Sequence, residues 1–114
     1  MIIKNITRNT IIAEEVIFAR DFKSRLVGLL GRSPLNPFSA MVFPRCNAIH
    51  TFFMRFAIDV LFLDGKGAVI GKIENMSPFR ITPFFLSAAT CLELPAGVIQ
   101  RSLTQISDII RIEV

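Results

Sequence analysis

Short runs of apolar residues, separated by polar and turn-forming residues, dominate the pattern along this chain. Runs of this length, rich in Ile, Val, Leu and Phe, predict β-strands more often than helices. The clearest pair covers residues 58–63 and 69–74, joined by the Asp-Gly-Lys-Gly sequence of residues 64–67, which is typical of a β-hairpin turn. Further strands are expected near the N-terminus and at residues 11–19, 40–43, 88–94 and 109–114.

Helical spacing of apolar residues is clearest over residues 21–31, which begin with Asp21 as an N-cap residue and end at Gly31. Residues 98–103 predict a further helical turn. Together these elements predict a mainly β protein of the α+β class, a compact antiparallel β-sandwich or barrel-like domain with one or two short helices. A chain of 114 residues, 52% of them hydrophobic, can bury one core, so residues 1–114 are expected to form a single domain.

The charge of the chain does not indicate a nucleic-acid partner. The formal net charge is +4, but the basic residues are spread from Lys4 to Arg111 without a run, whereas nucleic-acid-binding proteins cluster theirs. The N-terminus lacks the apolar core of a signal peptide, and no window offers the roughly 18 apolar residues of a membrane span. We therefore expect a cytoplasmic protein without a transmembrane segment, exported only if a signal peptide preceded this sequence. The oligomeric state stays open.

The cysteines do not predict a metal site. Cys46 and Cys91 lie far apart without a CxxC motif, and the chain has one histidine, whereas a structural zinc site usually needs four Cys or His ligands. We expect two buried free thiols, no metal and no cofactor. A nucleophilic role for Cys46 would need a base and an oxyanion donor, and the local spacing establishes neither.

Residues 45–59 combine most of the candidate chemistry, because Cys46, Asn47, the only histidine (His50) and Asp59 stand within an otherwise apolar run. Burying an unpaired polar group costs roughly 1–3 kcal/mol, and an unpaired carboxylate costs more. Such side chains therefore need partners or a function.

Two carboxylates in apolar strands need particular partners. Asp59 lies in a strand that is apolar on both faces, so it should pair with an arginine or accept several N–H bonds. The arginines considered are Arg45, Arg55 and Arg80. Glu93 precedes a Pro-Ala-Gly turn and is expected to cap exposed N–H groups there.

Two sequence motifs, IHTFFM at residues 49–54 and LELPAG at residues 92–97, resemble those of a bacterial and archaeal family, domain of unknown function 192. Further similarity lies at residues 24–32, 47–56, 58–64, 74–76 and 78–80. The resemblance extends over residues 20–110 and implies a compact, mainly β domain with a helix, but no established reaction. Many relatives resemble exported proteins, whereas this chain shows no signal sequence, so localisation is not carried over.

The chain departs from the family pattern at two loops. Ser107 precedes Asp108 where such proteins usually have a glycine, and residues 37–40 lack their usual glycine. These departures concern the conformation of the loops more than the fold.

Three functions are compatible with these residues. The leading hypothesis is a binding domain whose pocket takes a small polar or anionic ligand. The pocket residues would be Asn47, His50, Thr51, Asp59 and Glu93, with Arg80 as a further ligand-binding residue. The first alternative is a hydrolase that uses His50 with Asp59 or Glu93, so whether the protein is an enzyme stays open. The second is a protein-interaction module that exposes Phe79, Phe84 and Phe85 around Pro83. Burial of these three side chains would exclude this alternative.

Overall fold

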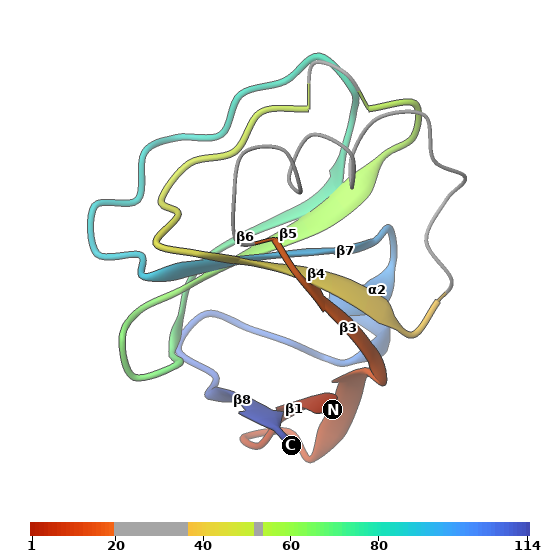
Figure 1. Ribbon diagram of the computed structural model, residues 1–114, viewed down its shortest axis with the longest axis vertical. Helices are drawn as coiled ribbons and strands as arrows, with labels where there is room; N and C mark the ends of the chain where they lie inside the picture. Colours follow the sequence, from red (N-terminus) through yellow and green to blue (C-terminus); the bar gives the residue numbers. More distant parts are fainter. Residues whose placement is uncertain (20–36, 52–53) are drawn as a thin grey trace.

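Two β-sheets, of three and five strands, form the structure (Figure 1). The computed structural model describes residues 1–19, 37–51 and 54–114. The elements are β1 (Ile2–Asn5), β2 (Thr10–Ala13), β3 (Glu15–Phe18), β4 (Ser39–Pro44), β5 (Ile58–Leu63), β6 (Val69–Met76), β7 (Thr90–Pro95), helix α2 (Val98–Arg101) and β8 (Ile110–Glu113). The mainly β fold expected from the sequence is confirmed, and the helix expected at residues 21–31 lies outside the described residues.

The larger sheet has the strand order β3-β4-β7-β5-β6, and the hairpin predicted from the sequence, β5 with β6, forms one end of it. The side chain of Asp64 accepts the N–H groups of Lys66 and Ala68, each at 2.9 Å, which closes the turn. Gly67 has a φ of 84°, and a Cβ atom there would lie 2.5 Å from the carbonyl oxygen of Ile110, so the turn needs a glycine. Every strand pair of this sheet is antiparallel except β3 with β4.

The smaller sheet has the order β2-β1-β8, so the first strand pairs with the last. The single strand expected at residues 11–19 is wrong, because β2 and β3 belong to different sheets. The break falls at Glu14, where the N–H groups of Glu14 and Glu15 both donate to the carbonyl oxygen of Phe38, at 2.7 and 3.0 Å. This shared acceptor turns the chain from one sheet to the other.

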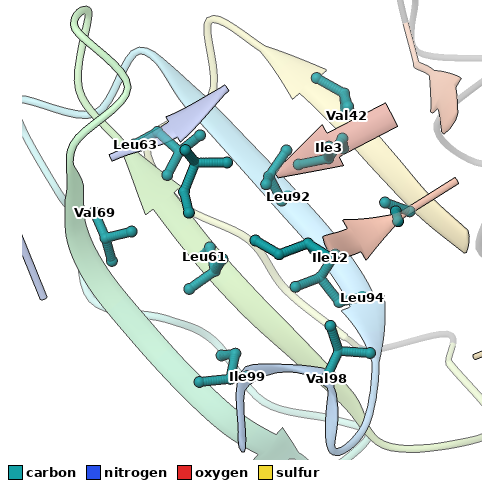
Figure 2. Packing of buried hydrophobic residues seen from close by; sticks show 13 residues of the cluster. Ile3, Ile12, Val42, Leu61, Leu63, Val69, Leu92, Leu94, Val98 and Ile99 are labelled. Carbon is teal, nitrogen blue, oxygen red and sulfur yellow. The ribbon is translucent and has the colours of Figure 1, made fainter. Parts of the chain in front are cut away.

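The main hydrophobic core lies between the two sheets (Figure 2). Ile3 and Ile12 of the smaller sheet face Leu61 and Leu92 of the larger one, and Val98 and Ile99 of α2 close one end of the core. Alternate residues of the same strands form a second cluster on the opposite face of the larger sheet, including Met41, Val60, Phe62 and Cys91. Both faces of β5 are therefore buried, as the sequence predicts.

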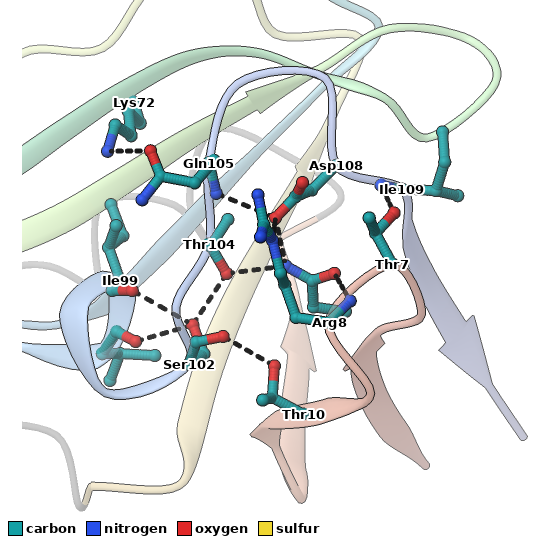
Figure 3. Close-up of polar contacts among 12 residues, drawn as sticks. Thr7, Arg8, Thr10, Lys72, Ile99, Ser102, Thr104, Gln105, Asp108 and Ile109 are labelled. Carbon is teal, nitrogen blue, oxygen red and sulfur yellow. Dashed lines mark hydrogen bonds and ion pairs between the residues drawn. The ribbon is translucent and has the colours of Figure 1, made fainter.

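A polar cluster joins the beginning and the end of the chain (Figure 3). Asn5 donates to Thr104 at 3.0 Å and to Asp108 at 2.9 Å, and Arg8 donates to the same Asp108 oxygen at 3.0 Å. Although burial alone would raise the pKa of Asp108, the hydrogen bonds and the charge of Arg8 lower it below its usual value. The cluster thus holds an ionised carboxylate that fixes the C-terminal loop to β1.

Candidate functional site

Two extended segments, residues 45–51 and 79–89, run antiparallel to each other beside the larger sheet (Figure 1). We call this pair the ribbon. Five backbone hydrogen bonds of 2.7–2.9 Å join the two segments, from Thr51 to Arg80, Phe79 to Thr51, Thr82 to Ile49, Phe85 to Asn47 and Arg45 to Ala89. His50 and Ile81 form an isolated antiparallel bridge within it. The ribbon is therefore a hydrogen-bonded unit rather than two independent loops.

The inner side of the ribbon packs on the second hydrophobic cluster. Ile49, Thr51 and Thr82 are buried. The ring of Phe85 stacks on the ring of Phe62 in β5, with centroids 4.2 Å apart and planes inclined by 27°. Packed aromatic pairs of this kind add roughly 0.5–1.5 kcal/mol to the effect of burial. This packing holds the ribbon against the sheet.

Four large apolar side chains of the ribbon are exposed: Phe79 by 73%, Ile81 by 68%, Phe84 by 64% and Leu86 by 83%. We call them the apolar patch. Phe79 has a φ of 62°, which is rare for a bulky residue and costs roughly 1–2 kcal/mol. Exposed apolar groups gathered in one segment mark an interaction surface more often than isolated ones do.

The charge of the ribbon is positive. Arg45, His50 and Arg80 are exposed, and neither residues 45–51 nor residues 77–89 contain an Asp or a Glu. Ion pairs within the described residues join Lys4 to Glu113, Arg8 to Asp108 and Lys72 to Glu74. Arg45 and Arg80 take part in none of these.

Arg80 lines a pocket of about 250 Å³ beside the apolar patch. The lining residues come from the C-terminal half of β6 and from residues 77–81, which lead into the ribbon: Ile73, Glu74, Asn75, Met76, Ser77, Arg80 and Ile81. A second pocket of about 390 Å³ is mainly apolar and contains none of the six residues expected to bind a ligand; it is lined by Pro37, Phe56, Ala57, Pro95, Ala96, Gly97, Val98 and Arg101. Arg101 there donates to the carbonyl groups of Pro37, Ile11 and Ile12, so its guanidinium has a structural role.

Asp59 is fully buried. Of the two arrangements expected for it, pairing with an arginine or accepting several N–H bonds, the structure shows the second. Its carboxylate accepts three backbone N–H groups, from Asn75 at 2.8 Å, Gly97 at 3.1 Å and Ile99 at 2.9 Å. Arginine takes no part in these bonds. The side chain joins the end of β6 to the beginning of α2, and its acceptor capacity is used by the fold itself.

Glu93 does not cap the turn that follows it, so this expectation is wrong. Asp59 accepts the N–H groups of Gly97 and Ile99 instead, because it lies on the neighbouring strand β5, opposite Leu94. Glu93 stands between Met41 and Val60 in the middle of the sheet and is 2% exposed. Burial, followed by the charge of Cys46, raises the pKa of Glu93 to about 8. Its carboxyl group has no hydrogen bond to any of the described residues.

The other expected site residues lie together on the ribbon. Thr51 is buried, and its hydroxyl donates to the carbonyl oxygen of Ser77 at 2.7 Å and accepts the N–H group of Arg80 at 3.0 Å. Asn47 contributes its carbonyl oxygen to the ribbon, and His50 is exposed. The structure therefore places Asn47, His50, Thr51 and Arg80 on the same ribbon, with Thr51 and Arg80 hydrogen-bonded to each other, while Asp59 and Glu93 are enclosed in the sheet.

The cysteines complete the residues for which the sequence suggested chemistry. Neither cysteine forms a disulfide; Cys91 is buried and Cys46 half-buried. Over residues 1–19, 37–51 and 54–114, no three His, Cys, Asp or Glu side chains are grouped so that they could hold a metal ion. Within the same ranges, no helix has the length and hydropathy needed to cross a bilayer.

The sequence pattern missed part of the exposed surface. Phe79 and Phe84 were named from the sequence, but Ile81 and Leu86 complete the apolar patch, and Phe85 is half-buried. Part of the signal was available, since residues 79, 81 and 84–86 are apolar and Pro83 interrupts the stretch. Such a pattern does not say which side of an isolated ribbon faces the solvent.

Comparison with known proteins identifies uncharacterised relatives. An uncharacterised protein of Pyrococcus furiosus, of the family UPF0127, is 34% identical over 107 residues, with 91% of each chain covered. Another UPF0127 protein, from Thermococcus sibiricus, is 33% identical over 114 residues and covers 96% of this chain and 73% of the relative.

Two crystal structures share the fold. One, described as a "putative transcription regulator" from Sinorhizobium meliloti, has a TM-score of 0.75 and 26% identity, with 84% of this chain and 79% of the other covered. The other, a protein of unknown function from Novosphingobium aromaticivorans, has a TM-score of 0.81 and 18% identity, with coverage of 97% and 82%. Residues 3–112 match the family described as "Uncharacterized ACR". The chain therefore belongs to the domain of unknown function 192 family, as its motifs suggest.

Proposed function

We propose that this domain is a non-catalytic interaction module that binds another protein through the ribbon. The observation that carries the proposal is the exposure of the apolar patch, Phe79, Ile81, Phe84 and Leu86. Burying one such side chain contributes roughly 1.5–3 kcal/mol. A partner that covers the patch therefore gains affinity from side chains that the fold itself leaves in water.

The construction of the ribbon supports the same function. Hydrogen bonds along the ribbon and the stack of Phe85 on Phe62 hold the backbone in place before any partner arrives. A preorganised surface loses little conformational entropy on binding, and aromatic residues are common at the centre of interfaces. The left-handed backbone of Phe79 is the kind of local strain that is concentrated at functional sites.

The two other functions considered from the sequence have less support. A small-ligand pocket would need Asp59 and Glu93 beside His50, yet both carboxyl groups are buried in the sheet and His50 is exposed. A hydrolase would need one of the same carboxyl groups within hydrogen-bond reach of His50 in an open cleft. The description of the Sinorhizobium meliloti protein suggests regulation, and the dispersed basic residues of this chain favour protein contacts over nucleic-acid contacts.

The proposal can be tested with a linear peptide library displayed on phage and selected on the immobilised domain. We expect the selected peptides to lose at least tenfold in affinity for a Phe84→Ser, Leu86→Ser double variant. Leu103→Ser is the matched control, since Leu103 is 60% exposed but lies outside the ribbon. Thermal unfolding of all three proteins checks that they fold. Peptides that bind the double variant as tightly as the parent would contradict the proposal.

A further inference from the structure

We infer that the partner is an extended peptide segment that carries a carboxylate beside its apolar side chains, and that Arg80 binds this carboxylate. The inference rests on the proposed function, because it concerns the same surface. It assigns a role to the pocket beside the apolar patch and to the charge of the ribbon.

The size of the pocket fits one side chain. Its volume of about 250 Å³ lies below the roughly 300–1,000 Å³ of typical small-molecule sites. Ile81 belongs both to the lining of this pocket and to the apolar patch, so one partner can occupy the two together. Asn75 and Ser77 add polar groups to its lining.

The backbone of Arg80 is fixed, while no carboxylate of the described residues neutralises its charge. Its N–H group donates to the Thr51 hydroxyl at 3.0 Å, and its carbonyl oxygen accepts the Thr51 N–H group at 2.9 Å. The guanidinium is exposed and forms no ion pair with the described carboxylates. Glu74, which also lines the pocket, lies 3.8 Å from Lys72. An exposed guanidinium on such a fixed backbone can donate two parallel hydrogen bonds to a carboxylate.

The strand beside the pocket, β6, favours an extended partner. β6 is an edge strand of the five-stranded sheet. Residues 107–109 cover its beginning, through bonds between Val69 and both Ser107 and Asp108. Along its C-terminal half, which borders the pocket, no strand other than β5 pairs with it in the described part of the chain. Extended peptides bind sheet edges by backbone hydrogen bonds and place alternate side chains in pockets.

Charge and shape favour this peptide over two other candidate partners, a second copy of the chain and an anionic membrane. In a symmetric dimer through the ribbon, Arg45 and Arg80 would face the same positive residues, and the ribbon offers no acidic residue in return. An anionic membrane would satisfy the charge, but a flat lipid surface would leave the pocket beside Ile81 unfilled. An acidic and apolar peptide satisfies both features.

The test uses peptides selected on the parent domain, with their affinities measured by fluorescence anisotropy. We expect the selected peptides to share an Asp or Glu at a fixed distance from their apolar residues. Arg80→Gln should weaken binding by about tenfold or more, and so should replacement of the peptide carboxylate by its amide. Both changes together should weaken binding little more than either alone, because they remove the same contact. Arg111→Gln is the control, since it removes an equal charge from an exposed residue of β8.

The outcomes separate the inference from the proposed function. Peptides whose affinity depends on Phe84 and Leu86 but not on Arg80 would overturn the inference, while the proposed function as an interaction module would still hold. Patch-dependent binding to vesicles of phosphatidylglycerol, without any selected peptide, would overturn it in favour of a membrane. A patch-dependent dimer in sedimentation experiments would overturn it in favour of a second copy. Peptides whose affinity changes neither with Arg80→Gln nor with the patch variant would overturn the inference and the proposed function together.

Discussion

The ring of Phe85 lies on the ring of Phe62, and the space for it is provided by Gly71. A Cβ atom on Gly71 would lie 2.5 Å from the nearest ring carbon of Phe85. The glycine therefore allows the ribbon to approach the sheet closely, and the position of the apolar patch depends on a residue that is not part of it.

Gly71→Ala should destabilise the protein by about 1–3 kcal/mol, because the added methyl group must displace the Phe85 ring. Chemical denaturation measures the change. Gly65→Ala is the matched control, since a Cβ atom there meets no other atom within 4 Å. Equal stability of the two variants would show that Phe85 can move at little cost.

Asp59→Ala should destabilise the protein by about 3 kcal/mol or more, which exceeds the effect of any other polar-to-alanine change in residues 45–59. The physical reason is that three N–H groups lose their common acceptor, and Ile99 is buried. Urea denaturation checks the value, with His50→Ala as an exposed comparison. A loss below about 0.5 kcal/mol would mean that water replaces the carboxylate without difficulty.

Because of Glu93, the stability of the protein should decrease as the pH rises from about 4.5 to about 8. The pKa of this carboxyl group is raised to about 8 in the folded protein from an ordinary value of 4.5. Within that window the unfolded chain releases a proton that the folded protein retains, which favours unfolding by up to roughly 1.4 kcal/mol per pH unit. Below the window both states are protonated, and the effect vanishes.

Glu93→Gln should remove this dependence and make the variant more stable than the parent near pH 8. Denaturation curves at several pH values test this. Asp108 does not interfere, because its lowered pKa affects stability only in more acidic solution, where protonation of its carboxylate removes stability. Parallel pH profiles for the parent and the variant would mean that Glu93 is ionised in the folded protein.

Ser107→Gly should stabilise the protein by about 0.5–1 kcal/mol. Ser107 has a φ of 78°, a conformation that costs residues other than glycine roughly 1–2 kcal/mol, and the larger flexibility of an unfolded glycine offsets part of the gain. The measurement is the thermal unfolding midpoint. Gly97→Ala, at a φ of 98°, should change the midpoint in the opposite direction. A lower midpoint for Ser107→Gly would show that the side chain itself is needed.

Local patterns predicted the local structure well. The β5–β6 hairpin and the burial of Asp59 followed from the Asp64–Gly67 turn sequence and from a strand that is apolar on both faces. The break at Glu14 was missed, because apolar residues resume directly after Glu14 and Glu15 and the acceptor, Phe38, lies far along the chain.

The candidate site was predicted only in part, for a related reason. Asn47, His50, Thr51 and Arg80 lie on the ribbon, but its pairing joins residues about thirty to forty positions apart, which periodicity does not report. The roles of Asp59 and Glu93 were likewise assigned by distance along the sequence. The neighbouring strand, not the neighbouring residue, supplies the acceptor for the turn after Pro95.

The pairing of β1 with β8 has a consequence for how the protein is made. Asn5 and Asp108 bond across 103 positions, so the smaller sheet cannot close until the C-terminal residues have left the ribosome. Until then Ile3 and Ile12, which cover the core, have no complete sheet to hold them in place. Contacts between such distant residues slow folding and lengthen the time for which apolar surface is open to aggregation. The nascent chain is therefore most in need of a chaperone just before β8 has left the ribosome.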